Sequence, residues 1–306
     1  MTLVLSWVFA GTYAFFSRSF SRVKATHAAW YTLVYGLMAP VTASLTLMIL
    51  FLPTLASPLV ADHCHGVMCV PHTLQMSIET FNGMLTVMLM VILLLCVAIV
   101  MIAQSLSGGR RLQALSDLSE GGAGGYRVVD NPAAIAWCAG LFRPQVYVSS
   151  GLVNTLSEQQ MQLVLAHELA HALRRDNLRK WFLHWATIAW PRSFKQRIRQ
   201  DFADYTEQVS DLAAVHICQE KKELPALIKL LDNCCSSKAR QRVPEYQARL
   251  QQRIEMLERE LERRAKKHTH KKKSSLIPGY IVASMCFASV VMAVHFGHPL
   301  LEWLSR

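Results

Sequence analysis

Residues 167–171 read His-Glu-Leu-Ala-His, and these residue types at this spacing could bind and use a metal ion. In a helix, His167 and His171 are four residues apart, so both imidazoles project from one face and can hold a single zinc ion. Glu168 lies beside that face, where its carboxylate can take a proton from a water that the metal activates. A shuffled chain of this composition would contain such a motif about 0.02 times, so the motif is informative. These groups are the ones that peptide-bond hydrolysis requires.

A zinc ion in a hydrolase needs a third protein ligand. Glu207, which follows the second histidine by 36 residues, is the preferred candidate, and Asp204 and His216 are the alternatives. Asp211 lies one helical turn after Glu207 and could accept a hydrogen bond from a ligand imidazole. Asp176 either orients a histidine in the same way or is only a charge at a helix end. The sequence therefore predicts one zinc ion per chain.

The composition indicates that this site belongs to a membrane protein. Hydrophobic residues make up 52% of the 306 residues and charged residues only 17%, which excludes a disordered chain and disfavours an ordinary soluble one. Apolar runs at 2–16, 29–52, 84–103 and 276–296 predict four transmembrane helices, although the first is shorter than the ~20 residues that span a bilayer.

The positive charges predict how these helices are oriented. Of the 32 Lys and Arg residues, 28 lie between Ala103 and Leu276, whereas the 53–83 loop has none. The positive-inside rule then places both termini and the 53–83 loop outside, and residues 106–275 in the cytoplasm of a multi-pass cell (inner) membrane protein. The charge is explained by topology and contact with the lipid bilayer, so we expect no direct nucleic-acid partner.

Residues 106–275 predict one α+β domain inserted between the third and fourth spans. A glycine-rich linker at 106–125 precedes short strands between residues 126 and 152, and helices follow from Ser157 onward. Tyr147 and Val148 form either an edge strand that pairs with an extended substrate or an internal strand.

The segments Gly140-Leu-Phe-Arg-Pro-Gln-Val-Tyr-Val-Ser-Ser-Gly-Leu152 and Leu165-Ala-His-Glu-Leu-Ala-His-Ala-Leu-Arg-Arg-Asp-Asn-Leu178, with the later Glu207-x-x-x-Asp211, resemble the BlaR/MecR family of integral-membrane zinc metallopeptidases. The resemblance covers about residues 133–215. It implies a zincin-like (gluzincin) domain in which His167, His171 and Glu207 bind zinc and Glu168 is the catalytic base. It also implies signal transduction, with a transcriptional repressor or the chain itself as the protein substrate.

About ten residues follow the fourth predicted span, so we expect no penicillin-binding sensor domain after it. The outer loop instead gathers sulfur and imidazole side chains that suit copper or zinc: His63, Cys64, His65, Cys69 and His72. The loop is either a metal or redox sensor or a short segment closed by a Cys64–Cys69 disulfide.

Two other functions remain compatible with the sequence. One is a quality-control membrane protease similar to the HtpX type, and the other is a signalling scaffold with a structural zinc ion. Apolar residues also recur at helical spacing in a charged segment, at Leu250, Ile254, Leu257 and Leu261. They predict either a coiled-coil-like seam for a homodimer or a face that packs on its own domain.

Overall fold

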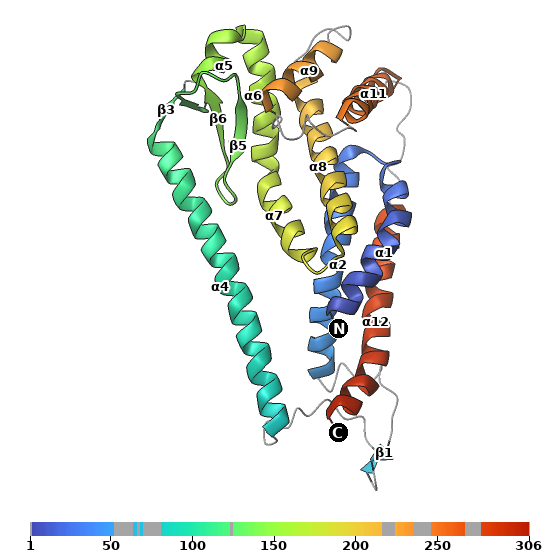
Figure 1. Ribbon diagram of the computed structural model, residues 1–306. Coiled ribbons are helices and arrows are strands. Elements are labelled where there is room, and N and C mark those ends of the chain that lie inside the picture. The colour runs from blue at the N-terminus through green and yellow to red at the C-terminus, as the bar shows by residue number, and fades with distance from the viewer. Residues whose placement is uncertain are drawn as a thin grey trace.

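The computed structural model describes residues 2–51, 64–65, 68–69, 81–122, 125–215, 224–235, 246–266 and 277–305. The described part is mostly helical, with one small mixed sheet near one end of the molecule (Figure 1). The helices are α1 (Thr2–Phe20), α2 (Ala25–Phe51), α4 (Phe81–Asp117), α5 (Ser150–Thr155), α6 (Glu158–Arg174), α7 (Asp176–Ala186), α8 (Arg192–Val215), α9 (Leu224–Cys235), α11 (Tyr246–Lys266) and α12 (Ile277–Ser305). The strands are β1 (Cys64–His65), β2 (Met68–Cys69), β3 (Ser119–Gly121), β4 (Arg127–Val129), β5 (Ala136–Ala139) and β6 (Gln145–Ser149).

Three of the described helices are long and apolar enough to cross a membrane: Ala25–Ile49 in α2, Val91–Asp117 in α4 and Gly279–Phe296 in α12. They confirm three of the four predicted spans and show a multi-pass membrane protein. The first predicted run is helical as α1, but it is not among these three helices. Polar residues such as Ser6, Thr12 and Arg18 lower its hydropathy, and α1 stops short of the level that α2 and α12 reach (Figure 1).

The predicted linker at 106–125 is wrong over most of its length, because α4 continues to Asp117. Gly108 and Gly109 each cost a helix about 1 kcal/mol relative to alanine. A helix that is already formed gains a hydrogen bond with each added residue, so the long preceding segment carries it through both glycines. None of the apolar window of α4 is buried within the chain, and Figure 1 shows α4 standing apart from α2 and α12.

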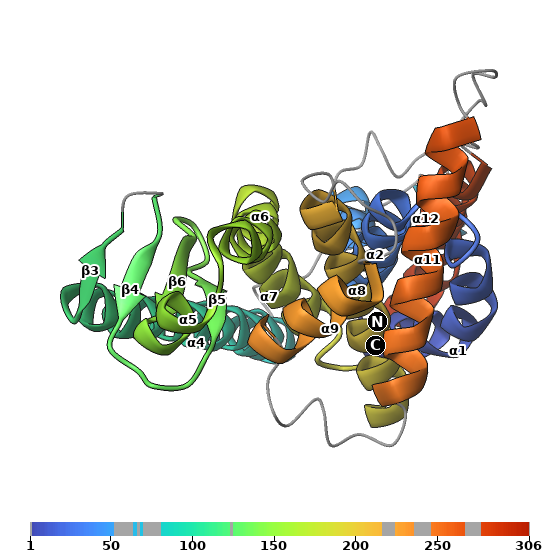
Figure 2. The same cartoon turned by 90° about the horizontal axis from the view of Figure 1, so that it is seen from above.

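The four-stranded sheet has the order β3-β4-β6-β5. β6 runs parallel to β4 and antiparallel to β5, with Tyr147 opposite Trp137 and Val148 opposite Ala136. Of the two alternatives for Tyr147 and Val148, the internal strand is therefore correct and the edge strand is wrong. Both side chains are fully buried, as in a strand covered on both faces. The outer strand on the side of α6 is β5 (Figure 2).

The helix that carries the motif has defined ends. Ser157 caps α6: its hydroxyl accepts from the Gln160 amide, and the Gln160 side chain accepts from the Ser157 amide, as in a capping box. α6 ends at Arg175, whose left-handed backbone (φ 52°) also begins α7. The chain thereby bends between the two helices, and Asp176 lies beside His171 in the last turn of α6.

Two apolar cores meet along α8. The first joins α1, α2, α7 and α8, and includes Tyr13, Tyr35, Leu183, Ile198 and Phe202. The second joins the sheet with α6, α8, α9 and α11, and includes Val148, Val164, Ala214, Ile228 and Leu257. Leu250 and Ile254 pack against this second core together with Leu257, so this apolar face of α11 packs on its own chain. Since α8 takes part in both cores, it joins the α1–α2 bundle to the sheet.

Candidate metal centre

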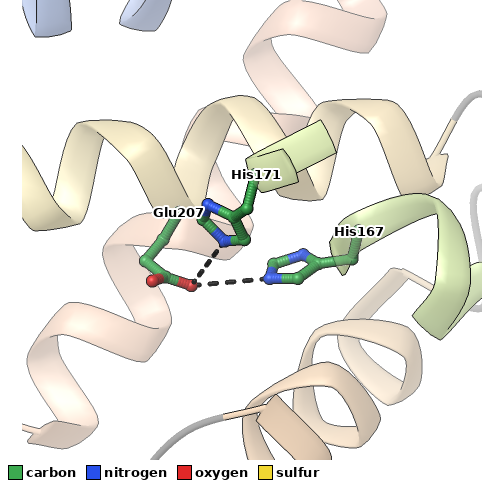
Figure 3. Close-up of side chains that lie close together, drawn as sticks. All are labelled: His167, His171 and Glu207. Carbon is green, nitrogen blue, oxygen red and sulfur yellow. Dashed lines mark ion pairs between the residues drawn. The ribbon is translucent and has the colours of Figure 1, made fainter. Parts of the chain in front are cut away.

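The structure brings His167, His171 and Glu207 together. One ligand atom from each lies within 4.8 Å of the others. The Nε2 atoms of His167 and His171 lie 3.5 and 3.8 Å from Oε2 of Glu207. Figure 3 shows the two imidazoles of α6 turned toward the carboxylate that α8 supplies. The two rings are 5.0 Å apart at an interplanar angle of 76°, so they approach the same point from different directions.

These three residues fit a zinc ion. His167 is buried, and its ring nitrogens face the carboxylates of Glu207 and Asp211 at 3.5 and 3.2 Å, but neither nitrogen forms a hydrogen bond with a described residue. Buried polar atoms without hydrogen bonds are rare in folded proteins, and a site for an ion is one of the usual reasons for them. Two imidazoles and one carboxylate form a donor set that zinc takes in hydrolases, where a fourth position stays open for water.

Each imidazole has an aspartate on its other side. His171 Nδ1 lies 2.7 Å from Asp176 Oδ2, and His167 Nδ1 lies 3.2 Å from Asp211 Oδ1. A histidine that binds a metal through Nε2 carries its proton on Nδ1, and a carboxylate there fixes the orientation of the ring. The two aspartates therefore leave both Nε2 atoms directed toward Glu207.

An arginine holds each of these aspartates. Arg174 contacts Asp176 and also donates to Thr206 O and Ser210 Oγ of α8, each at 3.0 Å. Arg253 of α11 donates from Nε and Nη2 to the two carboxylate oxygens of Asp211, at 2.8 and 2.7 Å. We did not predict either contact from the sequence. Arg174 stands within the motif, but nothing near Arg253 in the sequence indicates a partner 42 residues away.

The charges of the cluster shift its pKa values in opposite directions. Burial lowers the pKa of His167, but the carboxylates of Asp211 and Glu207 outweigh burial and raise this pKa to about 10. Burial raises the pKa of Glu207, but the two histidines outweigh it and hold this pKa well below its ordinary value. The carboxylates thus favour the protonated form of the two histidines, and a bound cation would compete with those protons.

Glu168 is buried on α6 between the two ligand histidines. Burial, and after it the carboxylate of Glu168, raise the pKa of the Cys138 thiol of β5 to about 12. Glu168 is therefore close enough to the outer strand to act on it electrostatically.

The other candidates lie elsewhere or outside the described residues. Asp204 accepts a hydrogen bond from Gln200 Nε2 at 2.8 Å and is not in the metal cluster. His216, His63 and His72 lie outside the described residues. In the outer loop, β1 and β2 pair antiparallel with Cys64 opposite Cys69, at the end of the molecule far from α6 (Figure 1).

The comparisons with known proteins agree with this chemistry. The sequence model of peptidase family M48 matches residues 107–303, which include the motif, Glu207 and α12. No curated protein and no solved structure shows a significant match. This match shows membership of family M48. It does not show whether the chain is a BlaR/MecR peptidase. Because the match covers more than half of the chain and the cluster supplies the ligand set, the chain belongs to peptidase family M48 and is a zinc metalloendopeptidase.

Proposed function

We propose that His167, His171 and Glu207 hold one zinc ion per chain and that Glu168 is the general base and acid of peptide hydrolysis. The observation that carries this proposal is the convergence of the three ligand side chains from α6 and α8. When bound, zinc would lower the pKa of a water molecule and polarise the scissile carbonyl. Glu168 takes a proton from the attacking water and returns it to the leaving amine.

The outer strand β5 is the proposed position of the substrate. It pairs only with β6 in the four-stranded sheet, and it forms the edge of that sheet that lies next to α6 (Figure 2). An extended peptide added along β5 would gain main-chain hydrogen bonds without a requirement for one sequence. A partly buried contact fixes this strand, because Asn177 Nδ2 donates to Cys138 O at 3.0 Å.

We propose that the active site faces the cytoplasm. The Lys and Arg residues concentrated between Ala103 and Leu276 support this orientation, with the 53–83 loop and both termini outside. In this arrangement α1 is a fourth membrane helix beside α2, α4 and α12, and residues 106–275 form the peptidase domain.

The proposed role is signal transduction by cleavage of a transcriptional repressor, of the chain itself, or of both. The resemblance of residues 140–178 and 207–211 to BlaR/MecR peptidases supports this role. The outer loop with Cys64 and Cys69 is the proposed sensor, as a metal site or a disulfide. Their backbone register, with Cys64 opposite Cys69, is compatible with a disulfide.

A second candidate is quality control of membrane proteins, as in the HtpX-type alternative. Two large apolar side chains on the zinc helix are exposed, Leu169 at 51% and Leu173 at 77%. Such surfaces suit the apolar segments of misfolded membrane proteins.

Protein turnover in cells distinguishes these substrates. The wild-type chain and Glu168→Gln are expressed in a deletion strain, and protein half-lives are measured across the proteome. In the signalling role, one repressor and the chain itself become stable in the variant. Stabilisation of many unrelated membrane proteins would instead support quality control. Full function of Glu168→Gln would contradict both roles and favour a scaffold with a structural zinc ion.

A further inference from the structure

The ion pair between Arg253 and Asp211 connects the metal centre to a helix that contributes no ligand. Arg253 is 5% exposed and Asp211 is fully buried, and the two charged groups meet through two hydrogen bonds of 2.8 and 2.7 Å. The same Asp211 carboxylate places Oδ1 3.2 Å from His167 Nδ1. A continuous chain of contacts therefore runs from α11 to the first ligand of the motif.

The carboxylate of Asp211 lies on the Nδ1 side of His167, where it can fix the orientation of the ring. Asp211 Oδ1 lies 3.2 Å from His167 Nδ1, and no described residue hydrogen-bonds this nitrogen in its place. Asp211 in turn needs a counter-charge, because a carboxylate buried without one is strongly unfavourable. Arg253 supplies that charge and, through its planar two-point contact, fixes the plane of the carboxylate.

We propose that Arg253 is a positioning residue of the zinc site: through Asp211 it holds the imidazole of His167 in the orientation that binds zinc. The ligand set is then complete only while α11 is seated on α8. This inference rests on the proposed zinc-binding role of His167, His171 and Glu207.

The position of α11 in the chain gives this contact a regulatory consequence. α11 ends at Lys266 and α12, a candidate membrane span, begins at Ile277, so only ten residues separate them. Leu257, one turn after Arg253, is buried in the core that contains the sheet and α6. A displacement of α12 that pulled α11 from α8 would withdraw Arg253 from Asp211 and weaken zinc binding.

The test uses the full chain in detergent and measures zinc affinity, peptide cleavage and the visible spectrum of the cobalt-substituted protein. Arg253→Gln should weaken zinc binding ~10–100-fold, the usual cost of losing a partner that orients a metal ligand. It should also change the cobalt spectrum, which reports ligand geometry. Arg253→Lys, which keeps the charge but not the two-point contact, should recover part of the affinity. The matched control is Arg259→Gln, because Arg259 lies on the same helix in an exposed pair with Glu255.

A single substitution would leave one buried charge without its partner and could unfold the protein. The double variant Asp211→Asn/Arg253→Met avoids this, because it removes both buried charges together. Zinc binding that is equally weak in Asp211→Asn and in the folded double variant, with the same altered cobalt spectrum, supports the proposal, because Arg253 then acts only through Asp211. Wild-type affinity and spectrum in the double variant, or in folded Arg253→Gln, overturn it. A wild-type chain that binds no zinc would instead contradict the proposed function itself.

Discussion

Nδ1 of His171 lies 2.7 Å from Oδ2 of Asp176, although the two residues belong to different helices. The left-handed backbone of Arg175 makes this contact possible, because it ends α6 and starts α7 within one residue. Arg174 then holds the same carboxylate. His167 has the equivalent arrangement through Asp211 and Arg253, built from residues of α8 and α11. One histidine is thus oriented by a local turn and the other by distant helices.

Asp176→Asn should weaken zinc binding by ~10–100-fold, because the amide is a poorer acceptor for the Nδ1 proton of His171. The measurement is a competition titration of the detergent-purified chain against a chelator of known zinc affinity. Asp130→Asn is the control, since this carboxylate is exposed and contacts Ser150 away from the site. Equal zinc affinity in both variants would show that Asp176 does not orient His171.

Arg175→Gly should leave the site intact and raise stability by up to ~1 kcal/mol, because glycine adopts the left-handed conformation without the penalty of a Cβ atom. Arg175→Val should lower stability by at least ~1–2 kcal/mol, since a β-branched residue fits this conformation poorly. Thermal unfolding of the two variants in detergent compares them. A valine variant as stable as the glycine variant would contradict the role assigned to this turn.

The sequence predicts the parts of the site that depend on local spacing. The four-residue interval between His167 and His171 places both on one face of any helix, and the helical pattern from Ser157 onward locates the start of that helix. Three spans follow from apolar length alone. These features need no knowledge of distant parts of the chain.

The parts that were missed depend on tertiary contacts. Arg253 meets Asp211 only because the apolar face of α11 packs on the second core, and no local pattern encodes that partner. The strand order puts β5 rather than β6 at the outside, which the run of apolar residues at 145–149 could not decide. Gly108 and Gly109 indicated a linker, but α4 continues through both of them. The spacing of glycines does not show how far a long helix that is already formed will extend.

Zinc binding should release protons. The metal-free site raises the pKa of His167 to about 10, so at pH 7 this imidazole carries a proton that zinc must displace. Affinity should therefore rise with pH, by about tenfold per unit for each displaced proton, until the pKa is reached. Calorimetric titration in two buffers of different ionisation enthalpy counts the protons. A binding enthalpy that is the same in both buffers would contradict this charge state.

Glu207→Gln should lower zinc affinity by more than the ~10–100-fold expected for a residue that only orients a ligand. The amide cannot provide the negative charge that completes the ligand set. Asp204→Asn, on the same helix and bonded to Gln200, should retain zinc. If the Asp204 variant lost zinc and the Glu207 variant kept it, the third zinc ligand would be Asp204 and not Glu207.

The most direct test of the account is the zinc content and peptide cleavage of the purified chain beside Glu168→Gln. The account predicts one zinc ion per chain in both proteins and a loss of cleavage of at least ~10²–10⁴-fold in the variant, the usual contribution of a general acid–base. Cleavage by Glu168→Gln at the wild-type rate, or a wild-type chain that cleaves without zinc, would contradict it.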